Sequence, residues 1–364
     1  TVDTKHPAQE RIARRVLHVL GALPTGVQRA IGGKPIRIDG QQLNTEVQMA
    51  LRLLNLTAGE TFETKPLDQG REELTAEAWV FGDALPVDEV RDLTIPGPAG
   101  PLPARLYRPA GIDEPSALLV YFHGGGWVLG DVEVSDSACR FLAVNAGIAI
   151  LSVDYRLAPE NPFPAAVEDA VAAFRWAVAQ ALSLGVDPAA IGVGGESAGG
   201  NLAAVVSQIT TAEAGPAPAF QLLFFPVTDL STKHHSYQLF PTGFFLTEAQ
   251  MDWYKERYLT DPAEALDPRV SPLLSEDLTG LPPAYVAVAG FDPLRDEGEA
   301  YARRLKEAGV PTTLRRHSGL IHGIINATGV GQAGKSALQE AAGALRVGLA
   351  ARAGLDHAAY PSDG

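Results

Sequence analysis

The chain has 364 residues, of which 46% are hydrophobic, with a formal net charge of -14 and one cysteine, Cys139. The negative charge argues against nucleic acid and anionic membrane surfaces as partners. The lone cysteine excludes an intramolecular disulfide and a cysteine-rich zinc site, and no apolar run reaches the roughly 20 residues of a membrane-spanning helix. We therefore expect one large domain in the cytoplasm that acts on a small molecule, with no integral membrane association.

The N-terminal region predicts helices. In "ERIARRVLHVLGAL" the apolar residues recur at helical spacing, opposite the arginines, at Ile12, Val16, Leu17 and Leu20. A basic amphipathic helix can lie on a membrane, but in a chain this acidic we expect its apolar side chains to pack onto the domain that follows. "NTEVQMALRLLNL" predicts a second helix, whereas the polar stretch 58–86 predicts a turn-containing connector. We expect residues 1–80 to form an accessory helical cap.

From Val90 onward, short runs rich in branched residues alternate with helical segments. The predicted strands are 90–95, 102–107, 116–123, 148–155, 190–195, 220–227, 283–290 and 311–317. The predicted helices are 135–146, 164–183, 198–211, 294–309 and 334–352. This order predicts an α/β domain over 81–364, with a mostly parallel eight-stranded sheet, helices on both faces and an antiparallel hairpin at its start. Residues 231–270 interrupt the alternation and are a candidate second piece of the cap.

The stretch "GVGGESAGGN" surrounds Ser197 with glycines, directly after a predicted strand and before a predicted helix. A strand-to-helix turn of this kind forces the serine backbone into an unfavourable region and exposes its oxygen at the edge of the sheet. The glycines two before and two after it are needed where strand and helix approach too closely for a β-carbon. Ser197 is therefore a candidate nucleophile; the alternative is an ordinary glycine-rich turn with a serine N-cap.

A second glycine cluster, "HGGGW", ends the predicted strand 116–123. Glycines there let backbone N–H groups point into a cleft, where they can stabilise the oxyanion formed during acyl transfer. The expected donors are Gly125 and Gly126, together with Ala198 after the serine, and Gly124 shapes the loop. The alternative is a flexible loop without a binding role.

A reactive serine needs a base and a carboxylate that orients it. His322 follows the last predicted strand in a loop and is our first choice of base, with His317 as the alternative. For the acid we prefer Asp292, held in the short turn "FDPLRD" at the carboxyl edge of the sheet. Asp229, which follows the preceding strand, is its rival.

The chain resembles the hormone-sensitive-lipase-like branch of the α/β-hydrolase esterases, bacterial family IV. The resemblance rests on "HGGGW", "DYRLAPENPFPAA", "GGESAGGNLAA", "DPLRDEG" and "HG", which occur in the order of the family over about residues 90–350. The chain order serine, aspartate, histidine also fits this fold. It implies that Asp154, Tyr155, Arg156 and Glu160 stabilise the fold, and we expect Arg156 and Glu160 to form a buried ion pair.

The resemblance implies a carboxylesterase that hydrolyses short- to medium-chain esters through an acyl-enzyme, without a metal or organic cofactor. The cap then bounds the pocket, with Trp127, Phe244 and Phe245 as candidate walls, although each can equally belong to the core. An amidase with the same residues and an inactive ligand receptor on the same fold remain alternatives. Members of the family are often dimers, so a homodimer is also among the expectations.

Overall fold

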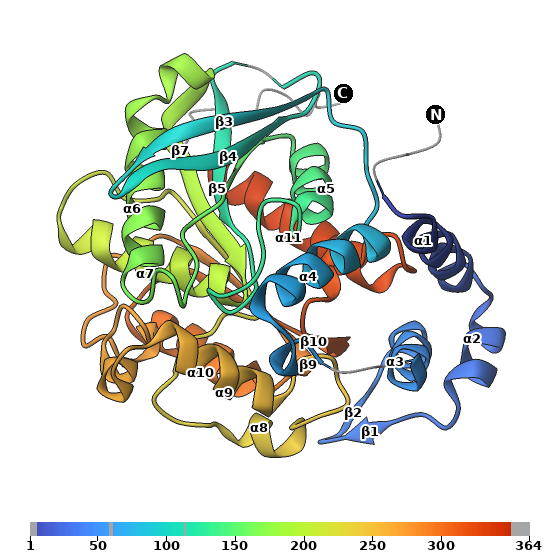
Figure 1. The fold of residues 1–364 in the computed structure, drawn as a ribbon. Helices are drawn as coiled ribbons and strands as arrows, with labels where there is room; N and C mark the ends of the chain where they lie inside the picture. The colour runs from blue at the N-terminus through green and yellow to red at the C-terminus, as the bar shows by residue number, and fades with distance from the viewer. Residues whose placement is uncertain (1–5, 58–60, 113, 351–364) are drawn as a thin grey trace, which may run out of the picture.

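The computed structural model describes residues 6–57, 61–112 and 114–350. The first five residues of the predicted cap and residues 351–364, which include the end of the predicted helix 334–352, lie outside the described residues. Its centre is an eight-stranded sheet with the strand order β10-β9-β8-β7-β5-β6-β4-β3 (Figure 1). The pairs from β10 to β6 are parallel, whereas β4 is antiparallel to both β6 and β3. The predicted α/β fold with its antiparallel opening hairpin is confirmed.

All eight predicted strands are present, with ends that differ by a few residues. They are β3 (Glu89–Gly97), β4 (Gly100–Arg108), β5 (Ser116–Phe122), β6 (Ala149–Val153), β7 (Val186–Glu196), β8 (Gln221–Phe224), β9 (Ala284–Phe291) and β10 (Thr312–Ile321). Every residue of β5, β6, β8 and β9 is buried, as expected for parallel strands covered on both faces. The carboxyl ends of the parallel strands consequently meet at one edge of the sheet.

Helices cover the two faces of the sheet in separate groups. The helices that cover the sheet are α5 (Asp136–Ala146), α6 (Ala165–Ala179), α7 (Ala198–Ala212), α10 (Arg295–Glu307) and α11 (Ala333–Ala350). Helices α6, α7 and α10 pack against one face, and α5 and α11 against the other. Leu118 and Leu119 of β5 belong to different clusters because successive side chains of a strand point to opposite faces.

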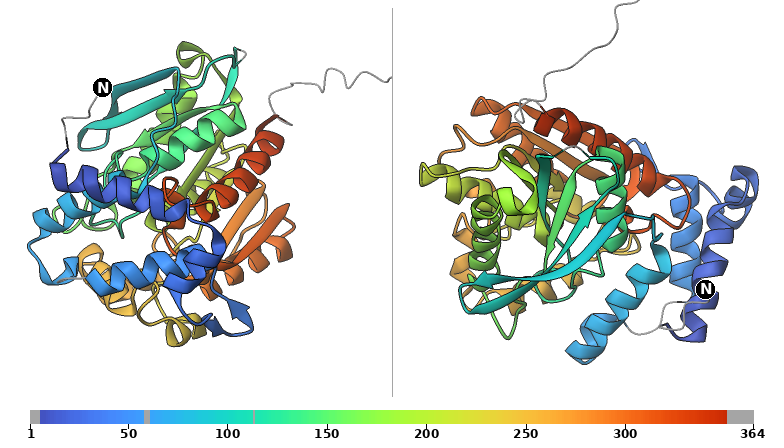
Figure 2. Two further views of the ribbon diagram at one scale, coloured as in Figure 1. Left: turned by 90° about the vertical axis from the view of Figure 1, so that its right-hand side faces the viewer. Right: turned by 90° about the horizontal axis from the view of Figure 1, so that it is seen from above.

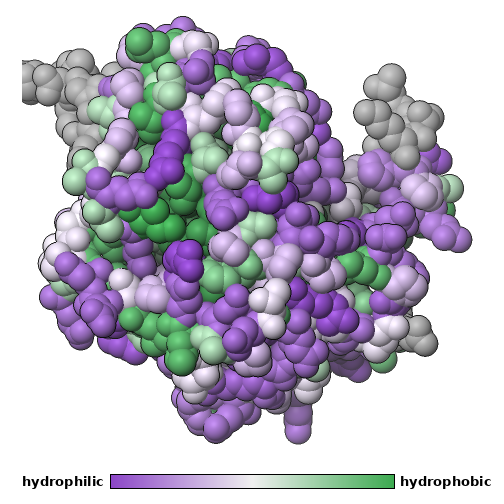
Figure 3. Space-filling view, turned by 60° about the vertical axis from the view of Figure 1, so that its left-hand side comes forward, coloured by the Kyte–Doolittle hydropathy of each residue, from purple (hydrophilic) through white to green (hydrophobic). Residues whose placement is uncertain are grey.

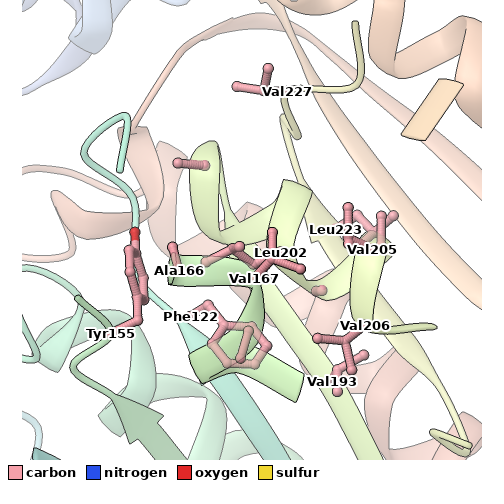
Figure 4. Packing of buried hydrophobic residues seen from close by; sticks show 14 of the residues in the cluster. Phe122, Tyr155, Ala166, Val167, Val193, Leu202, Val205, Val206, Leu223 and Val227 are labelled. Carbon is pink, nitrogen blue, oxygen red and sulfur yellow. The ribbon is translucent and has the colours of Figure 1, made fainter. Parts of the chain in front are cut away.

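Apolar side chains from strands and helices interdigitate beneath the turn that holds Ser197. Figure 4 shows Val193 of β7 beside Val206 of α7, and Phe122 of β5 and Val205 of α7 belong to the same cluster. These four residues are at most 1% exposed. Burial of one such side chain contributes about 1.5–3 kcal/mol, so this packing fixes where α7 begins relative to β5.

The N-terminal region contains four helices, α1 (Ala8–Gly21), α2 (Thr25–Gly32), α3 (Thr45–Thr57) and α4 (Leu67–Phe81), which lie on one side of the molecule (Figure 2). Two short strands, β1 (Arg37–Ile38) and β2 (Gln41–Gln42), and the 3-10 turn η1 (Phe62–Thr64) complete it. The prediction of a connector over 58–86 is wrong for residues 67–81, which form α4; residues 58–60 lie outside the described part.

The first helix leaves half of its apolar stripe exposed. Ile12 is 62% exposed and Val16 50%, whereas Leu17 and Leu20 are partly buried. Helix α1 instead contacts α4 through Arg14, whose Nη1 donates to the Trp79 carbonyl oxygen at 2.7 Å and whose guanidinium lies over the Trp79 ring. The prediction that the stripe packs onto the following domain is therefore wrong for Ile12 and Val16.

The excursion after β8 is built from short helices. It contains α8 (His235–Leu239), α9 (Glu248–Tyr258) and the 3-10 turn η3 (Pro262–Leu266), and η4 (Pro272–Leu274) follows. Thr247 and Gln250 form a capping box that starts α9. The face of the molecule in Figure 3 is mostly hydrophilic, with hydrophobic residues gathered in a few patches, as expected when the large apolar side chains fill two cores.

Candidate active site

Ser197 lies in a sharp turn between β7 and α7. Its backbone has φ 57° and ψ -119°, a conformation that residues with a β-carbon rarely adopt. The amide of Ser197 donates to the Phe224 carbonyl oxygen at 3.0 Å, and its own carbonyl oxygen accepts the amides of Asn201 and Val227 at 3.0 and 3.2 Å. Backbone bonds from β8, α7 and the loop after β8 therefore fix this strained residue.

The glycines on either side of the serine are required by close contacts. A β-carbon on Gly199 would lie 1.8 Å from the Phe122 carbonyl oxygen, and one on Gly195 would lie 2.4 Å from the same atom. The predicted close approach between strand and helix is also present, because a β-carbon on Gly195 would lie 2.5 Å from the Gly199 carbonyl carbon. At both glycines the shortest contact is therefore with the end of β5. The sequence did not predict this contact, because it depends on β5 lying next to β7 in the sheet.

The structure brings Ser197, His322 and Asp292 into one hydrogen-bonded chain. His322 Nε2 lies 2.9 Å from Ser197 Oγ, and His322 Nδ1 lies 2.8 Å from Asp292 Oδ2. Because a carboxylate only accepts, Nδ1 carries the imidazole proton and Nε2 accepts from the serine hydroxyl. Ser197 and His322 are each 7% exposed and Asp292 is fully buried. Such a chain can transfer the serine proton to the imidazole.

The buried carboxylate is itself oriented by the turn that holds it. Asp292 follows β9 directly, and its Oδ1 accepts the amide of Leu294 at 2.9 Å. His322 follows β10, and Gly323 after it has φ 72°, a left-handed conformation that suits glycine. The two side chains thus come from loops after adjacent parallel strands.

The rival acid, Asp229, belongs to a different hydrogen-bond group. Its Oδ2 lies 3.0 Å from His234 Nε2, and its Oδ1 accepts the amide of Ser231 at 2.9 Å. Burial acts to raise the pKa of Asp229, but the hydrogen bonds from His234 and Ser231 outweigh it and lower that pKa. Its carboxylate therefore orients the start of the excursion rather than the imidazole of His322.

The rival base, His317, lies within β10, where it is paired with Ala289 of β9. Its Nε2 is buried and has no hydrogen-bond partner among the described residues. Burial lowers the pKa of His317. The structure therefore does not bring His317 together with Ser197.

The glycine loop after β5 is tightly folded. Gly125 and Gly126 have φ of 112° and 61°, and a β-carbon on Gly126 would lie 2.2 Å from the Tyr254 ring of α9. The N–H groups of Gly125 and Gly126 donate to no partner within residues 6–57, 61–112 and 114–350. Gly124 lies beside Glu196, whose Cγ would be 3.2 Å from a β-carbon there. The loop is thus shaped by packing, with two amides left without partners.

Glu196, the residue before the serine, has a role that the sequence did not predict. It is 2% exposed, and its Oε1 accepts from Ser135 Oγ at 2.6 Å and from Asn326 Nδ2 at 3.1 Å. Asn326 lies in the 3-10 turn η5 (Ile324–Asn326) just after His322. Glu196 therefore links the serine turn to the histidine loop, a contact for which the sequence gives no spacing signal.

The "DYRLAPE" motif supports the glycine loop, but with other partners than expected. Tyr155 donates its hydroxyl to the His123 carbonyl oxygen at 2.8 Å. Arg156 pairs with buried Asp169 at 2.8 Å, not with Glu160. The expected Arg156–Glu160 ion pair is therefore wrong: Arg156 binds both carboxylate oxygens of Asp169 in α6, and Glu160 pairs with Arg71.

The three candidate pocket residues differ in burial. Trp127 is fully buried and stacks on Tyr258 with ring centroids 4.2 Å apart, so it belongs to the core and lines no accessible wall. Phe244 is partly buried and contacts Phe291 at 5.3 Å between centroids. Phe245 is 41% exposed and has φ 76°, and its ring lies 3.0 Å from a β-carbon placed on Gly323.

Among the described residues, no group of three or more histidine, cysteine, aspartate or glutamate side chains is arranged to bind a metal ion. Within the same ranges, no helix has the length and apolar character required to span a bilayer.

Comparison with known proteins identifies many similar sequences and structures. A family described as "alpha/beta hydrolase fold" matches residues 119–326. The chain is 45% identical to the carboxylic ester hydrolase LipN of Mycobacterium tuberculosis, over 91% of this chain and 90% of that protein. It is 39% identical to the ethyl acetate hydrolase of Pseudomonas putida, over 77% and 91%. An ester hydrolase from the Lake Arreo metagenome superposes with a TM-score of 0.82 at 42% identity, covering 84% of this chain and 98% of that one.

Proposed function

This chain belongs to the hormone-sensitive-lipase-like esterases of the α/β-hydrolase fold and is a carboxylic ester hydrolase, and from this premise we propose that Ser197, His322 and Asp292 are its catalytic triad. The observation that carries the proposal is the continuous hydrogen-bond chain from Ser197 Oγ through the imidazole to Asp292. These groups supply the nucleophile, base and orienting carboxylate that acyl transfer requires.

Acylation begins when His322 Nε2 takes the Ser197 proton as Oγ attacks the ester carbonyl carbon. The carbonyl π-electrons move onto oxygen and give a tetrahedral oxyanion. When this intermediate collapses, the bond to the alcohol oxygen breaks, and the imidazolium of His322 protonates the departing alcohol. Asp292 stabilises the imidazolium between these steps, and Ser197 remains as an acyl ester.

Deacylation repeats the same steps with water. His322 removes a proton as the water oxygen attacks the acyl carbon, and the second tetrahedral intermediate expels Ser197 Oγ, which regains its proton. The products are one carboxylic acid and one alcohol.

The proposed mechanism needs no metal ion or organic cofactor, so we expect EDTA to leave the hydrolysis rate unchanged. Strong inhibition by EDTA would contradict this mechanism.

The oxyanion hole in this proposal consists of the N–H groups of Gly125, Gly126 and Ala198. Support comes from the two loop amides without partners and from the position of Ala198 at the N-terminus of α7, which favours negative charge. Gly124 keeps the loop close to Glu196 beside the nucleophile. Loss of one such donor costs roughly a hundredfold or more in kcat.

The proposed substrates are esters of short to medium acyl chains. The family resemblance and a relative named for ethyl acetate support this size. We assign Phe244 and Phe245 to the pocket wall because both lie near the triad and neither is fully buried. The cap of this proposal combines the helices of residues 1–80 with the excursion 231–270, whose Tyr254 packs on Gly126.

Kinetics of Ser197→Ala with p-nitrophenyl butyrate test the triad. We expect kcat to fall by about ten thousandfold or more while the unfolding temperature is retained. A folded variant with near-normal activity would contradict the nucleophile assignment.

The anilide analogue tests the amidase alternative, which faster anilide cleavage would favour. A chain-length series defines the acyl preference, and sedimentation tests the homodimer, which stays a prediction.

A further inference from the structure

Helix α4 of the N-terminal region lies along the segment that follows the glycine loop. Its Gly70 packs on Leu129, whose Cδ2 would be 3.7 Å from a β-carbon at that glycine. One turn further along the helix than Arg71, Thr75 Oγ1 donates to Asp131 Oδ2 at 3.3 Å. Arg71, between these two contacts, projects from the same stretch of α4 onto the loop. Helix α4 of the N-terminal region therefore contacts residues that follow Gly126 by only three to five positions, Leu129 and Asp131.

Arg71 uses the whole of its guanidinium in this contact. Its Nε donates to the Val128 carbonyl oxygen at 2.9 Å, and its Nη2 donates to the Ala158 carbonyl oxygen at 3.1 Å. Its two terminal nitrogens also pair with both carboxylate oxygens of Glu160, at 2.8 and 2.7 Å. Arginine suits such a site because its planar group donates in several fixed directions, which lysine cannot do.

Two peptide groups connect Arg71 to a proposed oxyanion donor. The Val128 carbonyl and the Leu129 amide belong to one planar peptide, and the Leu129 amide donates to the Gly125 carbonyl oxygen at 2.9 Å. The Gly125 carbonyl shares its own peptide plane with the Gly126 N–H, which points the opposite way. Fixing the oxygen of this peptide therefore fixes the direction of the Gly126 N–H.

The second carbonyl that Arg71 binds reinforces the same loop. The Ala158 amide donates to the Trp127 carbonyl oxygen at 2.8 Å, so the turn containing Ala158 is attached to the loop beside Val128. On the other side, the Tyr254 ring packs directly on Gly126. Gly125 and Gly126 both have positive φ, so the peptide between them has more conformational freedom than one between ordinary residues. Contacts from outside the loop must therefore restrict it.

We propose that Arg71 is a positioning residue for ester hydrolysis, which orients the Gly126 N–H toward the oxyanion through the Val128–Leu129 peptide. The inference rests on the proposed function, because it assumes that this N–H stabilises the tetrahedral intermediate. It also makes α4 of the N-terminal region a part of the reaction machinery in addition to a cover for the pocket. A misplaced donor weakens binding of the transition state more than binding of the substrate.

The test compares full-length variants at Arg71. We expect Arg71→Gln to lower kcat for p-nitrophenyl butyrate by about tenfold to a hundredfold, with KM changed by less than about threefold. Affinity for a boronic acid, whose tetrahedral adduct on serine carries the negative charge of the intermediate, should fall by a similar factor. Arg71→Lys should lose less, because one ammonium can still donate to one carbonyl.

Two further variants separate the loop contact from the ion pair. Glu160→Gln removes the ion pair but leaves the two carbonyl bonds, so kcat should change by less than about threefold. Glu73→Gln is the matched control, because Glu73 of α4 binds Lys65 at 2.7 Å and Gln69 at 2.9 Å, and neither partner belongs to the loop. Its kcat should stay within about twofold of the parent.

Unfolding temperatures identify any variant that fails to fold, and Arg71→Lys then serves in place of Arg71→Gln. A folded Arg71 variant with unchanged kcat, or one in which only KM rises while boronate affinity stays constant, would overturn the inference. Glu73→Gln losing as much activity as Arg71→Gln would do the same. Ser197→Ala distinguishes the two proposals: if that variant stays active, the proposed function fails, whereas loss of activity there with an unaffected Arg71 variant removes only the present inference.

Discussion

The turns and loops that carry the proposed triad contact the sheet in one way, and the helices of the N-terminal region contact it in another. Asp292 is fully buried, and Ser197 is fixed by three backbone hydrogen bonds. In contrast, α1 leaves Ile12 and Val16 exposed and docks through polar groups such as Arg14. The difference suggests that the sheet determines the geometry of the triad, whereas the N-terminal helices act on it through a few directional contacts, of which Arg71 is the clearest.

Exchange of carboxylates should produce the largest effect and tests whether the sheet determines the triad. Asp292→Asn should lower kcat by about a thousandfold or more, because the amide can no longer select the imidazole tautomer that accepts the serine proton. Asp229→Asn should keep kcat within about tenfold, because Asp229 binds His234 and Ser231. Initial rates with one ester suffice. A greater loss in Asp229→Asn would identify Asp229 as the acid.

Glycine replacements test the close packing under the serine turn. Gly199→Ala should destabilise the protein by about 3 kcal/mol, because its β-carbon would overlap the Phe122 carbonyl oxygen. Gly343→Ala is the matched control in α11, where nothing lies within 4 Å of the new methyl group, and it should stabilise by about 0.5–1 kcal/mol. Urea unfolding measures both changes. Equal stabilities would show that the strand ends are less rigid than the contacts indicate.

The sequence predicted the fold best where runs of branched apolar residues or clusters of glycines mark the backbone conformation. Branched runs predicted all eight strands, and the glycines identified the turn at Ser197. Helix α4 was missed because only Gly70 and Val80 are buried in it, so it has little apolar periodicity, and it contacts the loop through Arg71. Its glutamates, leucines and alanines have high helix propensity, a signal that could have indicated it.

Pairings between distant elements could not be predicted. Arg156 and Glu160 are four residues apart in the sequence, yet their partners are Asp169 of α6 and Arg71 of α4. The partner of a charged side chain depends on how the helices pack against each other, and a single sequence does not give this packing. The amphipathic pattern of α1 likewise indicated an apolar stripe, but it did not indicate whether other elements cover that stripe.

The pH dependence of stability should reveal the Asp229 group. Because the pKa of Asp229 is lowered in the folded protein, its ionised form stabilises the fold fully above the unfolded pKa of about 3.9. This contribution is lost as the pH falls from that value through the lower pKa of the folded protein. Asp229→Asn should therefore cost about 1–2 kcal/mol at pH 7 and clearly less at pH 3. Denaturant unfolding at the two pH values measures this. An equal cost at both would remove the electrostatic explanation.

The smallest effect is expected on the exposed stripe of α1. Ile12→Ser should change the free energy of unfolding by less than about 0.5 kcal/mol, because most of this side chain already contacts solvent. Kinetic constants should also be unchanged. A loss of about 2 kcal/mol would show that Ile12 is covered in solution and would weaken the contrast between the two regions.

Mass spectrometry after reaction with a p-nitrophenyl alkylphosphonate tests whether Ser197 is the nucleophile, because the reagent bonds to an activated serine and expels nitrophenolate. We expect one covalent adduct per chain, located by peptide mapping on Ser197, and no adduct in His322→Ala over the same time. An adduct on a different residue, or esterase activity that survives complete modification of Ser197, would contradict the proposed triad.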